Sequence, residues 1–168
     1  MTQNAAKIRL ANRRDIPDIV RLWEELMDFH RKLDPFFTRA RNSADLFRRF
    51  LEQNLENDAA CVLVAQTEDG IVGYCQGMLE HHPPAVLEPD YGLVLDFAVT
   101  AAHRHSGIGR QMFEALCKWF RREGVHRIEV RHSTFNPLAA SFWPKMGFKP
   151  YLQTLFMELD TDHDSKGG

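Results

Sequence analysis

The sequence has few cysteines, no long apolar run and no excess of charge of one sign, and each lack excludes a class of protein. Its 168 residues include 3 cysteines and no Cys-x-x-Cys pair. We therefore expect no disulfide framework and no metal site, and we favour a reducing compartment, the cytoplasm. No stretch of about 18 apolar residues occurs, which argues against a membrane span. The 21 basic and 23 acidic side chains give a net charge of −2, and without a basic stripe nucleic-acid binding is not expected.

Length and hydrophobic periodicity predict one domain, 1–160, followed by a polar tail, 161–168. Expected strands cover 8–12, 61–65, 71–79, 91–99 and 127–131, and 148–159 is expected to give one or two more. Expected helices begin near Asp15 and Ser43, which are possible caps, and near Gly107 and Asn136. This order of elements predicts an α/β (α+β) domain built on one central sheet.

The stretch 95–110 carries the most chemical information. A buried strand runs into a polar loop, and Gly107 and Gly109 let the backbone bend where a helix starts. Free N–H groups and the helix dipole favour an anion such as a pyrophosphate there. Arg104 and Arg110 flank the same place. An ordinary helix start remains an alternative, because both the third glycine of GxGxxG and a Walker pattern are missing.

Two motifs at a fixed separation resemble the GNAT superfamily of N-acetyltransferases. Arg104-x-x-Gly107-x-Gly109 after an apolar strand looks like the acyl-CoA loop of that family. The second signature, an Asn-led helix that ends in Gly-Phe, is similar to Asn136-x-x-Ala139-x-x-Phe142-Trp143-x-x-x-Gly147-Phe148. One expected helix and one expected strand separate the motifs, as in the family. The resemblance covers 93–148 and implies a mixed, mainly antiparallel central sheet flanked by about four helices.

The resemblance implies acetyl-CoA as the co-substrate and assigns residues to it. Phe97, Ala98 and Val99 would pair with the pantetheine arm and the acetyl carbonyl through their backbone, on a strand that splays from its neighbour. Asn136 would bind the pantetheine or cap its helix. Trp143 stands where the family often has a tyrosine acid. The residues that would wrap the pyrophosphate are Arg104, His105, Ser106, Gly107, Ile108, Gly109 and Arg110.

The implied reaction is direct attack of a neutral amine on the thioester carbonyl, for which a base must take the amine proton. Asp96 is the only charged residue in an apolar strand beside the implied acetyl site. Burial there would raise its pKa to a useful value. A purely structural hydrogen bond of Asp96 to a neighbouring strand is the alternative. Glu80, His81 and His82 are further candidates for the base.

The general acid is not assigned by the sequence. The indole of Trp143 cannot supply a proton, and packing along the pantetheine channel is the simpler role for it. Tyr74, Tyr91 and Tyr151 are candidates for the acid. A thiolate whose pKa is about 8.5 could also leave without help.

In the family, the region of the first helix borders the acceptor pocket. The spacing of Trp23 is typical of a helix stripe packed on the sheet. Phe36 and Phe37 follow a helix-stopping proline and suit a pocket better. Phe29 also lies in this region. Three acidic residues could attract a cationic acceptor, although solvated surface is the default for them: Asp28, Asp34 and Glu88.

These features together predict an N-acetyltransferase that moves the acetyl group of acetyl-CoA to a primary amine of a small molecule or peptide. A non-catalytic acyl-CoA-binding or sensing module is one alternative, because the tyrosine is missing. A protein lysine or N-terminal acetyltransferase is another. A homodimer joined through the terminal strands follows from the resemblance alone.

Overall fold

The computed structural model describes residues 6–159, so the predicted tail at 161–168 lies outside the described residues. Its sheet has the order β1-β2-β3-β4-β5. The first four strands pair antiparallel, and β5 runs parallel to β4. The strand bounds are Lys7–Leu10 for β1, Ala60–Thr67 for β2, Gly70–His81 for β3, Asp90–Val99 for β4 and Ile128–Val130 for β5.

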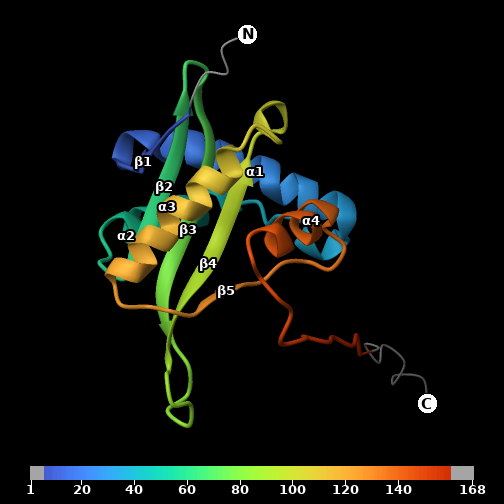
Figure 1. Cartoon of the computed structure of the whole chain (residues 1–168). Helices are drawn as coiled ribbons and strands as arrows, with labels where there is room; N and C mark the ends of the chain where they lie inside the picture. Colours follow the sequence, from blue (N-terminus) through green and yellow to red (C-terminus); the bar gives the residue numbers. More distant parts are fainter. Residues whose placement is uncertain (1–5, 160–168) are drawn as a thin grey trace, which may run out of the picture.

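Helices cover both faces of the sheet (Figure 1). The helix bounds are Ile16–Leu33 for α1, Ser43–Leu55 for α2, Ile108–Arg122 for α3 and Pro137–Lys145 for α4. α1 and α2 pack on one face, α3 packs on the other, and α4 lies beside the free edge of β4. The predicted fold class, a mixed α/β domain with a mainly antiparallel sheet, is confirmed. In the described part of the chain, no helix combines the length and hydropathy that a membrane crossing requires.

Alternation along the strands divides the core into two halves. In β2, Cys61 and Leu63 face α3, whereas Val62 and Val64 face α1 and α2. The three cysteines are buried and free. Within residues 6–159, no group of His, Cys, Asp and Glu side chains is arranged to hold a metal ion.

The helix α3 forms where its sequence pattern predicts it. Its inward stripe includes Met112, Leu116 and Phe120, each with an exposed fraction of 0%. Gly124 ends the helix with a φ of 77°, and the amide of Val125 donates to the carbonyl of Phe120. The helix is therefore fixed against the sheet along its whole length, which holds its first turn in place.

Strand β4 has two neighbours over only part of its length. It pairs with β3 from Asp90 to Val99 but with β5 only from Gly92 to Val94. A β-bulge falls at Leu95, because Gly77 pairs with Val94 whereas Gln76 pairs with Asp96. Beyond the bulge, one edge of β4 has no strand beside it in the described structure. This splay opens the sheet next to α4.

The predicted terminal strands at 148–159 are wrong. No strand forms there, and the chain runs away from the sheet (Figure 1). Leu152, Leu155 and Phe156 are 76%, 82% and 82% exposed. A β-prone sequence does not hold a strand without a partner, and this segment finds none in the described chain.

The two predicted helix caps also differ. The carboxylate of Asp15 accepts from Nη1 and Nη2 of Arg9 at 2.7 and 2.8 Å instead of capping α1. Asn42, rather than Ser43, precedes α2, and it makes no side-chain cap bond. The carboxylate of Asp15 is held instead by a bidentate ion pair with Arg9, six residues earlier in β1, and by the amide of Asn12.

Candidate functional site

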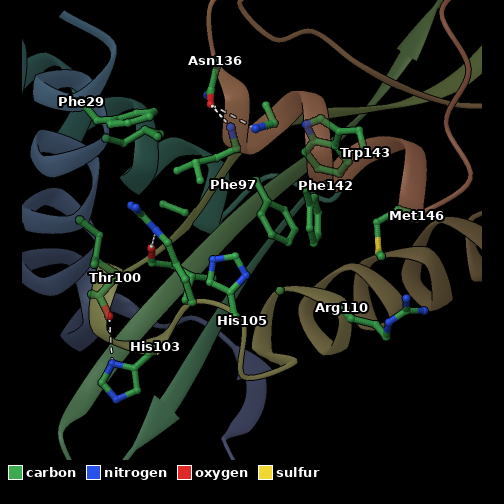
Figure 2. Close-up of a pocket in the computed structure, with 18 of the residues that line it drawn as sticks. Phe29, Phe97, Thr100, His103, His105, Arg110, Asn136, Phe142, Trp143 and Met146 are labelled. Atoms are coloured by element: carbon green, nitrogen blue, oxygen red, sulfur yellow. Dashed lines mark hydrogen bonds between the residues drawn. The ribbon is translucent and has the colours of Figure 1, made fainter. Parts of the chain in front are cut away.

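A cavity of about 430 Å³ opens where β4 loses its second neighbour. Its walls come from α1, the end of β4, the loop before α3, and α4 (Figure 2). Most of the cofactor residues that the sequence predicted line it, namely Phe97, Ala98, Val99, Arg104, His105, Gly107, Gly109, Arg110, Asn136 and Trp143. Ser106 and Ile108 are not among the lining residues. Ser106 Oγ donates to the carbonyl of His103, and Ile108 is buried in the core.

The unpaired edge of β4 presents backbone groups to the cavity. The amide of Thr100 donates to the carbonyl of Val72 in β3, so Thr100 faces the paired side. Since backbone groups alternate along a strand, Val99 and Phe97 face the open side. The carbonyl of Val99 accepts there from Nε of Arg104 at 3.1 Å. Such an edge can pair with an extended ligand that carries amides.

The loop before α3 ends in a helix start without a side-chain cap. Gly107 is the N-cap residue with a φ of 89°, and His105 has a φ of 62°. The first helical hydrogen bond runs from the amide of Gln111 to the carbonyl of Gly107. The amides of the first turn, 108–110, are therefore left for an anion. Lys145 of α4 also lines the cavity and adds positive charge that neither sequence motif indicates.

A chain of side chains fixes this loop. The ring of His103 contacts Thr100 Oγ1 through Nδ1 at 3.0 Å and Asp69 Oδ2 through Nε2 at 3.2 Å. The first of these contacts is visible in Figure 2. Asp69 belongs to the turn between β2 and β3, so the loop is tied to a rigid hairpin. The cavity wall is thereby preorganised.

Asn136 caps α4 and also reaches α1. Its Oδ1 accepts from the amides of Leu138 and Ala139, both at 3.1 Å. Its Nδ2 must then point the other way, where it lies 3.2 Å from Nε2 of His30. An amide nitrogen only donates, so His30 accepts through Nε2 and carries its proton on Nδ1. Burial lowers the pKa of His30 and favours this neutral form.

Trp143 packs inside an aromatic cluster. It is 5% exposed, and its ring lies 5.3 Å from that of Phe97 and 5.2 Å from that of Phe148. Phe142 fills the space beside Gly109, where an added Cβ would come within 3.1 Å of its ring. These contacts join β4 to α4 and close the inner end of the cavity.

Asp96 lies on the α1 and α2 face of β4, next to the cavity rather than among its lining residues. Its Oδ2 accepts from Nε2 of Gln76 at 2.8 Å. The residue is half-buried, yet protein surrounds its carboxyl. Burial raises the pKa of Asp96 to about 6, and the Gln76 hydrogen bond opposes that rise. The side chain is thus both hydrogen-bonded and able to titrate near neutral pH.

The other candidate bases lie away from the cavity. Glu80 and His81 are at the far end of β3, and His81 contacts Asp90. His82 contacts Glu129 at 3.1 Å and stacks on Tyr91. This loop projects from the end of the sheet opposite the splay (Figure 1).

No tyrosine is among the described residues that line the cavity. Tyr74 is fully buried, and its hydroxyl has no hydrogen-bond partner in the described structure. Tyr151 donates to Glu129 at 2.8 Å, outside the cavity. Tyr91 stacks on His82 and does not line the cavity either.

Trp23 packs as its spacing predicted, but Phe36 and Phe37, the better pocket candidates by sequence, are not among the residues that line the cavity. Trp23 stacks on Phe47 with ring centroids 4.4 Å apart, which is a packing role. Phe29 lines the cavity, whereas Phe36 is 84% exposed and Phe37 packs against the ring of His30. Asp28 contacts Arg39 at 3.4 Å, Asp34 accepts from the amide of Phe36, and Glu88 is exposed.

Comparisons with known proteins give one family and one fold. The model of the Acetyltransferase (GNAT) family matches residues 21–148. No curated protein matches the chain. A solved mutant of the BH1408 protein from Bacillus halodurans is 26% identical, with 91% of this chain and 99% of that chain covered and a TM-score of 0.83. A predicted acetyltransferase from Clostridium acetobutylicum, solved with acetyl-CoA, is 17% identical, with 91% and 96% covered and a TM-score of 0.74.

Proposed function

Since the chain belongs to the GNAT acetyltransferase family, we propose that it transfers the acetyl group of acetyl-CoA directly to a primary amine of a small molecule or peptide. The observation that carries this proposal is the continuity of one cavity. It joins the unpaired edge of β4 to the uncapped start of α3. The two features suit the two ends of a pantetheine diphosphate.

We assign the pantetheine arm to the backbone of Phe97 and Val99, which would take the place of the missing strand. Arg104 leaves the Val99 carbonyl when that arm binds and turns to the diphosphate. The diphosphate is held by the first-turn amides of α3 and by the cations around them, Arg104, Arg110 and Lys145. In support, the structure solved from Clostridium acetobutylicum contains acetyl-CoA on the same fold.

We propose that Asp96 is the general base. An amine that resembles lysine has a pKa of about 10 and is mostly protonated at pH 7, so it must lose a proton to attack. A backbone N–H near Phe97 stabilises the negative charge that develops on the carbonyl oxygen. The thiolate leaves without a tyrosine, because no described tyrosine lines the cavity and a thiol pKa of about 8.5 requires little help.

Two measurements test this function. Acetyl-CoA at 100 times its Kd should stabilise the fold by about 2.7 kcal/mol, which a thermal-shift assay detects. A thiol-release assay across small amines and peptides then identifies the acceptor. Binding without thiol release from any amine would favour the sensing module. Release with peptides alone would favour a protein acetyltransferase.

We further propose that 1–160 acts as one domain in the cytoplasm and that two copies associate through the segment 151–159. Its apolar side chains, including Leu155 and Phe156, are exposed to an extent that is unusual for a monomer. Light scattering should give a dimer mass for the native chain and a monomer mass for a Leu155→Lys, Phe156→Lys variant. A monomer mass for the native chain would refute the association.

A further inference from the structure

Three polar side chains form a line beneath the splay of the sheet. They come from the last turn of α2, from β3 and from β4. Nδ2 of Asn54 donates to Oε1 of Gln76 at 2.9 Å, and Nε2 of Gln76 donates to Oδ2 of Asp96 at 2.8 Å. Asn54 is 5% exposed and Gln76 is 0% exposed. Two amides at this depth are costly to bury unless they are hydrogen-bonded.

The donor and the acceptor in both hydrogen bonds are fixed by chemistry. A carboxylate only accepts, so Gln76 must turn its NH₂ group to Asp96 and its carbonyl oxygen away. That carbonyl then needs a donor, and Asn54 supplies it. Each hydrogen bond polarises the next one in a dry environment. The line therefore favours an ionised Asp96 and occupies only one of its two oxygens.

We propose that Gln76 and Asn54 are positioning residues for proton transfer, which hold Oδ2 of an ionised Asp96 and leave Oδ1 to take the proton of the amine. This inference rests on the proposed role of Asp96 as the base. In the step, the amine nitrogen forms a bond to the acetyl carbon and the C–S bond breaks. The electron pair of that bond leaves on sulfur as thiolate. The attacking amine is neutral, and the one proton that its nitrogen then loses reaches Oδ1 through water, because Asp96 lies beside the cavity rather than among its lining residues.

The surroundings of Asp96 agree with this role. Burial and the Gln76 hydrogen bond are the two causes that act on its pKa, in opposite directions. The negative charge of Asp96 contributes to the raised pKa values of two neighbouring titratable groups, Tyr74 and Cys75 of β3. Both stay neutral, because burial raises their pKa values well above the usual range. With a pKa of about 6, Asp96 is about 90% ionised at pH 7. Loss of the Gln76 bond would reduce that share.

The test is the pH dependence of kcat in variants that keep side-chain size. Gln76→Met should move the acid limb of the profile upward by about one pH unit, so that kcat falls about tenfold below pH 6 and recovers above pH 8. Asn54→Leu should move the limb in the same direction by less. The thermal shift with acetyl-CoA should stay unchanged in both. If Gln76→Met does not fold, Asn54→Leu decides the matter.

Two controls separate this inference from its premise. Val64→Ala loosens the same side of the core, at a residue that is 0% exposed, without touching the line. It should lower stability and leave the limb in place. If Asp96→Asn keeps the native kcat, the proposed base is wrong. If Asp96→Asn loses turnover while Gln76→Met and Asn54→Leu keep the native limb, the base stands and the positioning role is refuted.

Discussion

A charge placed at the start of α3 should abolish most of the response to acetyl-CoA. Gly107 is the N-cap of that helix with a φ of 89°, and an added Cβ would have no atom closer than Nε2 of Gln111 at 3.9 Å. A side chain at this position therefore has room, and its cost lies in the backbone conformation and in its charge. Gly107→Ala supplies the backbone cost alone, whereas Gly107→Glu adds the charge.

The size of the effect follows from Coulomb's law. The left-handed conformation costs either variant about 1–2 kcal/mol of stability. A carboxylate about 4 Å from a diphosphate oxygen is opposed by about 1–4 kcal/mol, depending on solvent exposure. A value of about 2.5 kcal/mol raises Kd by about 70-fold. At a concentration of 100 times the native Kd, the stabilisation then falls from about 2.7 to about 0.5 kcal/mol.

Thermal denaturation with and without acetyl-CoA measures these values. For a domain of this size, the native protein should gain about 5–10 °C, Gly107→Ala about the same, and Gly107→Glu about 1–2 °C. A full response in Gly107→Glu would refute the placement of the diphosphate at this helix start. Loss of the response in Gly107→Ala would instead indicate that the loop conformation, rather than charge, controls binding.

Three further predictions use other assays. Asp96→Asn should keep the thermal shift with acetyl-CoA and lower kcat by at least about 100-fold in a thiol-release assay; a smaller loss would contradict its role as the base. Burial lowers the pKa of His30, so near that pKa the unfolded chain binds more protons than the folded one. The contribution of neutral His30 to stability is therefore present above pH 6.5 and is lost as pH falls. Urea unfolding should show a smaller change in the free energy of unfolding between pH 7.5 and pH 5.5 for His30→Gln than for the native chain. An added Cβ at Gly92 would lie 2.4 Å from the ring of Phe120, so Gly92→Ala should cost about 1–3 kcal/mol in urea unfolding, and an unchanged midpoint would contradict this packing.

Much of the fold could be predicted because its signals are local. The stripe of α3, the glycine at its end and the apolar run of β4 each depend on residues within one element. The family resemblance from two motifs is confirmed by the match over residues 21–148. The helix starts at Gly107 and Asn136 were visible for the same reason.

The rest depended on contacts between distant residues. Gln76 reads as one polar residue in an apolar strand until the register places it opposite Asp96. The tautomer of His30 follows from the cap that Asn136 makes, more than a hundred residues later. The strands expected at 148–159 failed for a related reason, because a strand needs a partner that composition does not specify.

The short pairing of β4 with β5 has a mechanical consequence. Only Gly92–Val94 join the antiparallel part of the sheet to the strand that follows α3. A ligand bound in the splay would therefore contact both β4 and the segment around β5 and α4, which are joined by few hydrogen bonds at that edge. Hydrogen exchange of the β5 amides should be slower with the ligand bound than without it, so ligand binding and release would alternately stabilise and destabilise this edge of the domain.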